Sequence, residues 1–151
     1  MAAPISDLEA HVGFWLRFVS NQVSGRFRRL VEAEGVTVSE WVALRQLYTD
    51  DTVSAAQLVT SLGMTKGAVS KILARLEQAG LARRADHPDD GRAQTIALTR
   101  AGRALVPRLA ALADANDAHF FAYLPEATRA ALVATLRDLV RHHGLASVPI
   151  D

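Results

Sequence analysis

The sequence has no cysteine, so it can form no disulfide, thiolate metal site or cysteine nucleophile, and it cannot sense oxidants through a thiol. Nine glycines and five prolines in 151 residues are too few for a fibrous or low-complexity chain. The longest stretch without a charged side chain, 52–65, spans 14 residues, whereas a membrane span needs roughly 18 apolar ones. Asp7 and Glu9 stand where a secretion signal has basic residues. We therefore expect a cytoplasmic protein with no membrane partner.

The charge is unevenly distributed along the chain, although the net charge is only +1. Residues 54–103 contain eight basic and four acidic side chains, and the rest of the chain contains nine basic and twelve acidic ones. The length and an apolar content of 50% indicate one globular domain of ordinary size. A basic middle between acidic ends predicts one surface for a polyanion and another role for the flanking segments.

The apolar residues recur mostly at helical spacing, which predicts a mainly α-helical chain. The first helix is expected to open with a capping box at residues 6–9 and to carry an apolar stripe for about eight turns, until Gly35. A stripe of this length exceeds what the core of a small domain needs, so we expect part of this helix to pack outside its own domain. Further helices are expected after the capping residues Thr37, Ser54, Thr65 and Thr99, and from Pro125 onward.

A helix-turn-helix followed by a β-hairpin is predicted in the middle of the chain. Two short helices, 55–62 and 66–79, are separated by about three residues that include a glycine. After Gly80 the periodicity changes, and residues 81–86 and 93–98 have the pattern of two strands. The segment between them contains Pro-Asp-Asp-Gly, which is typical of a turn.

The second short helix has the composition of a DNA-recognition helix. Its spacing fixes a core face, which consists of Val69, Ile72, Leu73 and Leu76. The opposite face has small or basic residues and no acid, as expected of a helix that enters the major groove. The candidate DNA contacts are Ser54, Thr65, Lys66, Gly67, Ser70, Lys71 and Arg75. An ordinary solvated face is the alternative, and the neighbouring turn and hairpin favour the DNA interpretation.

The hairpin supplies a second set of candidate DNA contacts. Arg92 stands at its tip, where an arginine can enter the narrow minor groove. Asp90 can orient that guanidinium or cap the turn, and Gly91 lies between them. Arg83 and Arg84 at the base of the hairpin are expected to lie near the DNA backbone. Taken alone, the hairpin is better explained as an ordinary solvated turn.

Residues 54–102 closely resemble the MarR family of winged helix-turn-helix transcription regulators. The resemblance is carried by the helix-turn-helix, by RLEQAGL at 75–81, by DGR at 90–92 and by LTRAG at 98–102. The flanking helices agree in number and order. Two departures are visible: the middle residue of the DGR signature, often basic in the family, is Gly91, and the absence of cysteine excludes the thiol-switched branch.

The resemblance implies a mainly α fold with a small β-hairpin wing, formed by one domain over residues 1–151. It implies a winged helix-turn-helix DNA-binding lobe at 36–100 and N- and C-terminal dimerisation helices at 5–35 and 100–145. It further implies a homodimer that binds double-stranded DNA at a pseudo-palindromic operator, and repression that a small aromatic or phenolic effector relieves. No cofactor is implied.

Four aromatic residues are candidates for the wall of an effector pocket, namely Phe14, Trp15, Trp41 and Tyr48. The alternative is that they are core or dimer-interface residues, because large apolar side chains at helical spacing usually are.

Other classes of protein fit the sequence less well. An enzyme is not expected, because the five histidines form neither an i, i+4 pair nor a His-Glu-x-x-His run, and no Gly-rich phosphate loop occurs. We expect no metal site, although a metal-responsive regulator stays open through Glu9, His11, His119, His142 and His143. A non-specific architectural DNA-binding protein is the other alternative.

Overall fold

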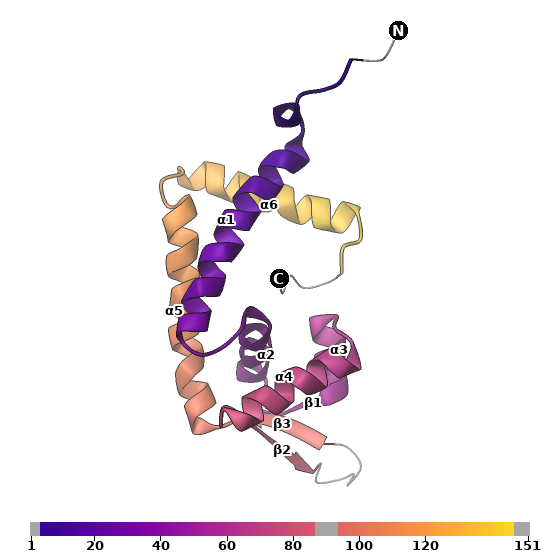
Figure 1. The fold of residues 1–151 in the computed structure, drawn as a ribbon, viewed down its shortest axis with the longest axis vertical. Helices are drawn as coiled ribbons and strands as arrows, with labels where there is room; N and C mark the ends of the chain where they lie inside the picture. Colours follow the sequence, from indigo (N-terminus) through magenta and orange to yellow (C-terminus); the bar gives the residue numbers. More distant parts are fainter. Residues whose placement is uncertain (1–3, 87–93, 147–151) are drawn as a thin grey trace.

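The fold was analysed in a computed structural model that describes residues 4–86 and 94–146. Its elements are a 3-10 turn (Leu8–Ala10), α1 (Val12–Ala33), α2 (Val38–Thr49), β1 (Val53–Ser54), α3 (Ala55–Leu62), α4 (Lys66–Gln78), β2 (Ala82–Asp86), β3 (Gln94–Leu98), α5 (Arg100–Phe121) and α6 (Glu126–His142). In Figure 1, α1 and α5 run side by side from a lobe of α2–α4 and the sheet to the opposite end, where α6 crosses. This architecture confirms the predicted mainly α fold with a small wing.

Four of the five predicted side-chain caps are confirmed. The Thr37 hydroxyl accepts from the Glu40 amide, and the Glu40 carboxylate accepts from the Thr37 amide, which completes a capping box. Ser54, Thr65 and Thr99 cap their helices in the same way, each by accepting from the amide three residues later. These caps satisfy amides that have no partner within the helix.

The capping box expected at residues 6–9 is wrong. The chain forms a 3-10 turn there, and α1 starts only at Val12, with no side-chain cap. The ring of Trp15 donates to the Glu9 carbonyl at 2.9 Å, and His11 Nδ1 lies 3.0 Å from the Asp7 carbonyl. The side chains of His11 and Trp15 therefore bind backbone carbonyls that a longer helix would use for its own hydrogen bonds.

The three strands form one antiparallel sheet in the order β1–β3–β2. The two strands predicted for the hairpin pair with each other, Ala82 with Leu98 and Arg84 with Ile96. β1 was not predicted, and its Val53 pairs with Ile96 on the other edge of β3. This pairing attaches the start of the helix-turn-helix to the wing.

The core lies in the lobe and at the lobe end of α1 and α5. Its largest fully buried side chains are Leu44, Leu47, Leu58, Leu73, Leu76, Ile96, Leu109, Val31 and Val106. By contrast, α6 contributes no buried residue. The described chain is therefore well packed at the lobe and only partly packed at the opposite end.

A close backbone approach joins the end of α4 to the start of α5. The Thr99 hydroxyl donates to the Gly80 carbonyl at 2.6 Å and accepts from the Gly102 amide at 3.1 Å, and the Thr99 amide donates to the Leu81 carbonyl at 3.0 Å. Gly80 has a φ of +70°, a conformation that favours glycine. A Cβ atom on Gly102 would lie 2.1 Å from the Leu81 carbonyl oxygen. Only glycine fits at position 102 without a backbone shift.

Replacing Gly102 with alanine is expected to lower the free energy of unfolding by about 2 kcal/mol or more, because the new methyl group must push the Leu81 backbone away. Chemical denaturation followed by circular dichroism measures this change. The matched control is Gly67→Ala in α4, where nothing lies within 4 Å of the added Cβ. That variant should be about 0.5–1 kcal/mol more stable than the parent. Equal stability of the two variants would contradict the role of the junction.

Candidate functional site

The α4 helix presents a basic outer face, as its sequence predicts. The apolar stripe is buried, and Lys66, Gly67, Ser70 and Lys71 are exposed on the other side. The Thr65 hydroxyl, 3.2 Å from the Ala68 amide nitrogen, fixes the start of the helix. The predicted contact residues on this face are therefore accessible to solvent, and the helix that carries them is packed against the core through its apolar stripe.

Lys66 and Lys71 are the only two lysines of the chain, and both lie on α4. Within the ranges 4–86 and 94–146, neither has a carboxylate within 4.0 Å. A lysine ammonium is a compact charge that binds phosphate readily. No acid of the described chain offsets these two charges at close range, so they remain available to an anionic partner.

Two other predicted contacts, Arg75 and Arg84, already have acidic partners. The Arg75 guanidinium lies 3.7 Å from the carboxylate of Glu40 in α2, and that of Arg84 in β2 pairs with the carboxylate of Glu77 at the end of α4. Inspection of one helix face could not reveal the first pair, because Glu40 comes from another helix. These arginines contribute less positive field to the surface than the lysines do.

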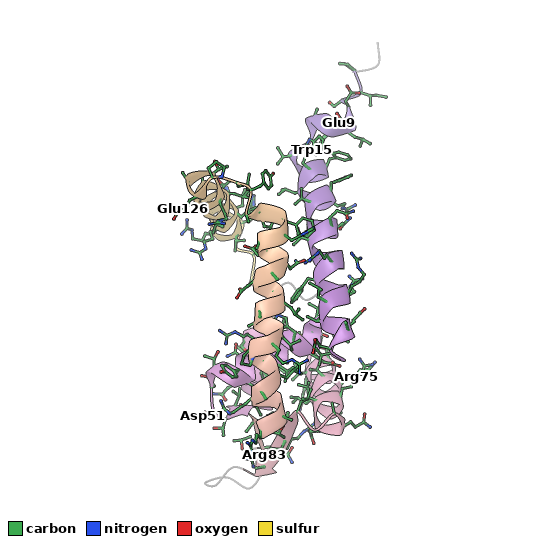
Figure 2. The ribbon with its side chains drawn as sticks, turned by 90° about the vertical axis from the view of Figure 1, so that its left-hand side faces the viewer. Glu9, Trp15, Asp51, Arg75, Arg83 and Glu126 are labelled. Atoms are coloured by element: carbon green, nitrogen blue, oxygen red, sulfur yellow. The ribbon has the colours of Figure 1, made fainter. Side chains whose placement is uncertain are left out.

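The remaining predicted DNA contacts lie around the wing. The Ser54 hydroxyl caps α3 by accepting from the Gln57 amide at 3.1 Å. The Ser54 backbone belongs to β1 and pairs with β3. Arg83 is exposed on β2, at the lobe end of the molecule in Figure 2. Asp90, Gly91 and Arg92 lie outside the described residues, so their roles stay predictions.

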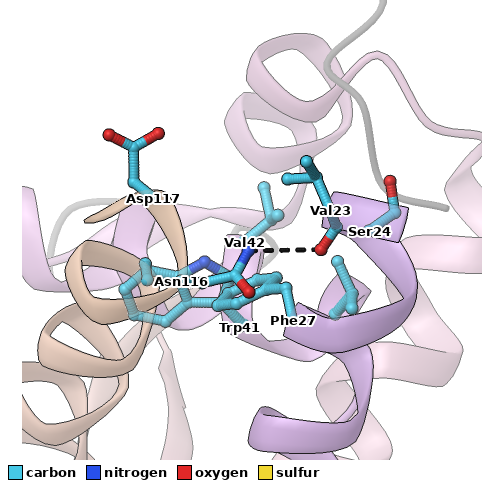
Figure 3. A pocket seen from close by; sticks show the side chains of 9 residues that line it. Val23, Ser24, Phe27, Trp41, Val42, Asn116 and Asp117 are labelled. Atoms are coloured by element: carbon cyan, nitrogen blue, oxygen red, sulfur yellow. Dashed lines mark hydrogen bonds between the residues drawn. The ribbon is translucent and has the colours of Figure 1, made fainter. Parts of the chain in front are cut away.

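A cavity of about 290 Å³ lies where α1, α2 and α5 meet (Figure 3). Its lining consists of Val23, Ser24, Phe27, Val38, Trp41, Val42, Ala113, Asn116 and Asp117. The rings of Phe27 and Trp41 meet edge to face, with centroids 6.4 Å apart. Apolar and aromatic walls with a few polar groups are typical of small-molecule sites.

Asn116 is the polar group most deeply placed in this wall, with only 4% of its surface exposed. Its amide donates to the Val23 carbonyl at 3.2 Å, the bond drawn in Figure 3, and its carbonyl accepts from Arg26 at 3.0 Å. The side chain thus ties α5 to α1. Asn116 and Phe27 were not among the predicted pocket residues, and only the membership of Phe27 in the first apolar stripe pointed to it.

The structure brings one of the four predicted pocket residues, Trp41, to this cavity. Phe14 and Trp15 pack edge to face at the far end of α1, where Figure 2 labels Trp15. Tyr48 lies two turns beyond Trp41 on α2, about 10 Å along the axis, and its ring is 5.9 Å from the Arg103 guanidinium. These three residues line no wall of the cavity.

The helices away from the lobe carry a large uncovered apolar surface, which we call the distal apolar surface. Its residues are Val12, Trp15, Leu16, Phe18 and Val19 of α1 and Leu132, Val133, Leu136, Leu139 and Val140 of α6. Those of α6 are 38–45% exposed and those of α1 are 43–73% exposed. Exposed apolar stripes of this kind, one on α1 and one on α6, are typical of protein interfaces.

The described residues form neither a metal-binding cluster nor a membrane-spanning helix. Within 4–86 and 94–146, no three His, Asp or Glu side chains come together in a way that could hold a metal ion. The helices in these ranges also lack the combination of length and apolarity needed to cross a bilayer.

Known proteins similar to this chain are transcriptional regulators. A family model described as the MarR family matches residues 34–93. An HTH-type transcriptional repressor of Mycobacterium tuberculosis is 35% identical over 122 residues, which cover 81% of this chain and 83% of that protein.

Solved structures share the fold of this chain. One is the structure of Bordetella bronchiseptica BpsR, a protein whose DNA binding is regulated by 6-hydroxynicotinic acid. It has a TM-score of 0.77 at 26% identity, and the match covers 91% of this chain and 97% of that one. S. aureus MepR, solved with DNA, has a TM-score of 0.77 at 22% identity, and the match covers 87% of this chain and 98% of that one. This match shows that the two chains share a fold. The Mycobacterium tuberculosis relative is a regulator and not an enzyme, and the chain itself belongs to the MarR family.

Proposed function

We propose that the protein is a repressor that binds a pseudo-palindromic operator in double-stranded DNA, with α4 in the major groove. The observation that carries this proposal is the placement of both lysines of the chain, without a nearby acid among the described residues, on the outer face of α4. Lysines in this position bind phosphates and bring the small residues Gly67 and Ser70 close to base edges. The Mycobacterium tuberculosis relative, named as a repressor, supports the direction of regulation.

We propose a homodimer as the DNA-binding form, with the lobe at 36–100 on DNA and the helices at 5–35 and 100–145 forming the interface. A second copy suits the distal apolar surface because a two-fold axis lets α1 and α6 of one chain cover those of the other. The two lobes then read half-sites about 34 Å apart, one turn of DNA.

We further propose that the cavity binds a small aromatic or phenolic effector that weakens DNA binding. The cavity lies between α1 and α5, which extend to the distal surface, and α2, which packs in the lobe. An occupant therefore contacts both halves of the chain. The 26% identical BpsR, whose DNA binding responds to a hydroxylated aromatic acid, supports this class of effector.

Specific binding is tested with a duplex selected from a random library by the purified protein. We expect a preference of about 10³-fold or more over scrambled duplex at physiological salt. Lys71→Gln should weaken binding to both duplexes and reduce the salt slope by about one per subunit, because it removes a phosphate contact. Arg141→Gln, which removes the same charge from the end of α6, is the control. Equal affinity for the two duplexes would favour an architectural protein.

The dimer is tested by light scattering at micromolar concentration. We expect a mass of about twice 16.3 kDa for the parent. Leu136→Glu should shift the mass toward that of one chain, because it places a charge in the middle of the apolar stripe of α6. Ala131→Glu, on the opposite side of the same helix, should leave the dimer intact. A parent mass of one chain would contradict the proposal.

The effector site is tested with Trp15→Phe, which leaves Trp41 in the cavity wall as the only tryptophan. Titration with 6-hydroxynicotinate or 4-hydroxybenzoate should change its fluorescence and lower operator affinity by about 5-fold to 150-fold. Adding Ala113→Leu, which fills the cavity from α5, should abolish both responses while the protein still binds operator. Release of DNA without a Trp41 response would place the effector elsewhere.

A further inference from the structure

Glu40 is unusual in this chain because it is a charged residue that is only 7% exposed. One carboxylate oxygen accepts from the Thr37 amide at 2.9 Å and completes the capping box of α2. The other oxygen lies 3.7 Å from the Arg75 guanidinium. A glutamine serves a capping box as well as a glutamate does, so capping explains neither the charge nor its burial. A buried carboxylate is costly unless a cation pairs with it, and Arg75 supplies that cation.

Arg75 lies at the edge of α4 and not in the middle of its outer face. It is nine residues from Lys66, which places the two side chains about 180° apart around the helix. It is about 60° from Ile72 of the buried stripe. Arg75 and Glu40 line one hollow together with the α1–α2 turn, and Figure 2 shows Arg75 beside the lower end of α1. This edge of α4 faces α2.

We infer that Glu40 is a positioning residue for the recognition helix: through Arg75 it fixes the C-terminal half of α4 against the first turn of α2. The N-terminal half of α4 has the Thr65 cap, and the buried stripe holds the helix down without preventing small rotations. The ion pair supplies a lateral constraint that apolar contacts lack. Arg75 thus acts on DNA by orienting Lys71 and Ser70. The inference rests on the proposed function, since its effect is read in DNA binding.

The same turn of α2 also lines the cavity. Val38, Trp41 and Val42 form its wall on this side, and Glu40 directly precedes Trp41. A displacement of this turn by an occupant changes the distance between Glu40 and Arg75. The effector is therefore expected to act on the Glu40–Arg75 ion pair from the side of α2, and the operator from the side of α4.

The inference is tested with Glu40→Gln, Arg75→Gln and the double variant, on the selected duplex and at several salt concentrations. Glutamine at position 40 keeps the cap and loses the charge. Each single variant should weaken operator binding by about threefold to tenfold with an unchanged salt slope, and the double variant should be no weaker than either single one. Arg75→Lys should restore part of the affinity. The control Glu32→Gln removes an exposed acid from the last turn of α1.

The direction of the effect separates this role from others. Loss of an acid alone strengthens binding to a polyanion, so Glu32→Gln should bind as tightly as the parent or more tightly. Weakening by Glu40→Gln would therefore not be a charge effect, and thermal unfolding checks that the variants are folded. A lower salt slope in Arg75→Gln, or unchanged or tighter binding by Glu40→Gln, would overturn the inference. If the parent itself selects no duplex, the proposed function fails and the positioning role fails with it.

Discussion

The geometry of the lobe depends on the hydroxyl of Thr99. It donates to the carbonyl of Gly80, just after α4, and accepts from the amide of Gly102 in the first turn of α5. Each hydrogen bond contributes only about 1 kcal/mol net, so the importance of the junction is geometric. It fixes the end of the helix that carries both lysines to the start of the helix that extends to the distal surface. The missing side chain of Gly102 lets the two backbones touch there. The direction of α4 is thereby set by that of α5.

The chain divides into a half that buries its own apolar residues and a half that does not. The lobe has a continuous core of leucines and valines, whereas every residue of α6 is exposed. Most helical stability in proteins comes from packing of an apolar face, and α6 buries no residue in this chain, so the proposed second copy would stabilise it. We therefore expect the folding of the distal half to be coupled to association. A regulator built in this way has a DNA affinity that depends on its own concentration.

Most features that local chemistry determines were predicted from the sequence, the cap at residues 6–9 excepted, and those that depend on distant partners were not. Thr37, Ser54, Thr65 and Thr99 cap helices because a hydroxyl and the amide three residues later suffice. β1 escaped prediction because two residues carry no periodicity and their partners, Ile96 and Thr95, are far along the chain. An apolar stripe predicts which side of a helix is covered but not by what. Trp41 therefore lies in the cavity while Trp15 lies at the far end of α1.

Two buried polar side chains, Glu40 and Asn116, connect the walls of the cavity to different halves of the chain: Asn116 lies in the wall, and Glu40 directly precedes the wall residue Trp41. Asn116 holds α5 to α1, and Glu40 holds α2 to α4. Apolar contacts tolerate small sliding movements, whereas hydrogen bonds and ion pairs lose strength when their geometry changes. The 3.0 and 3.2 Å bonds of Asn116 join the α1 and α5 walls of the cavity to each other, whereas the 3.7 Å ion pair of Glu40 joins the α2 wall to α4. A molecule in the cavity that displaced the first turn of α2 would therefore act on α4 through Glu40.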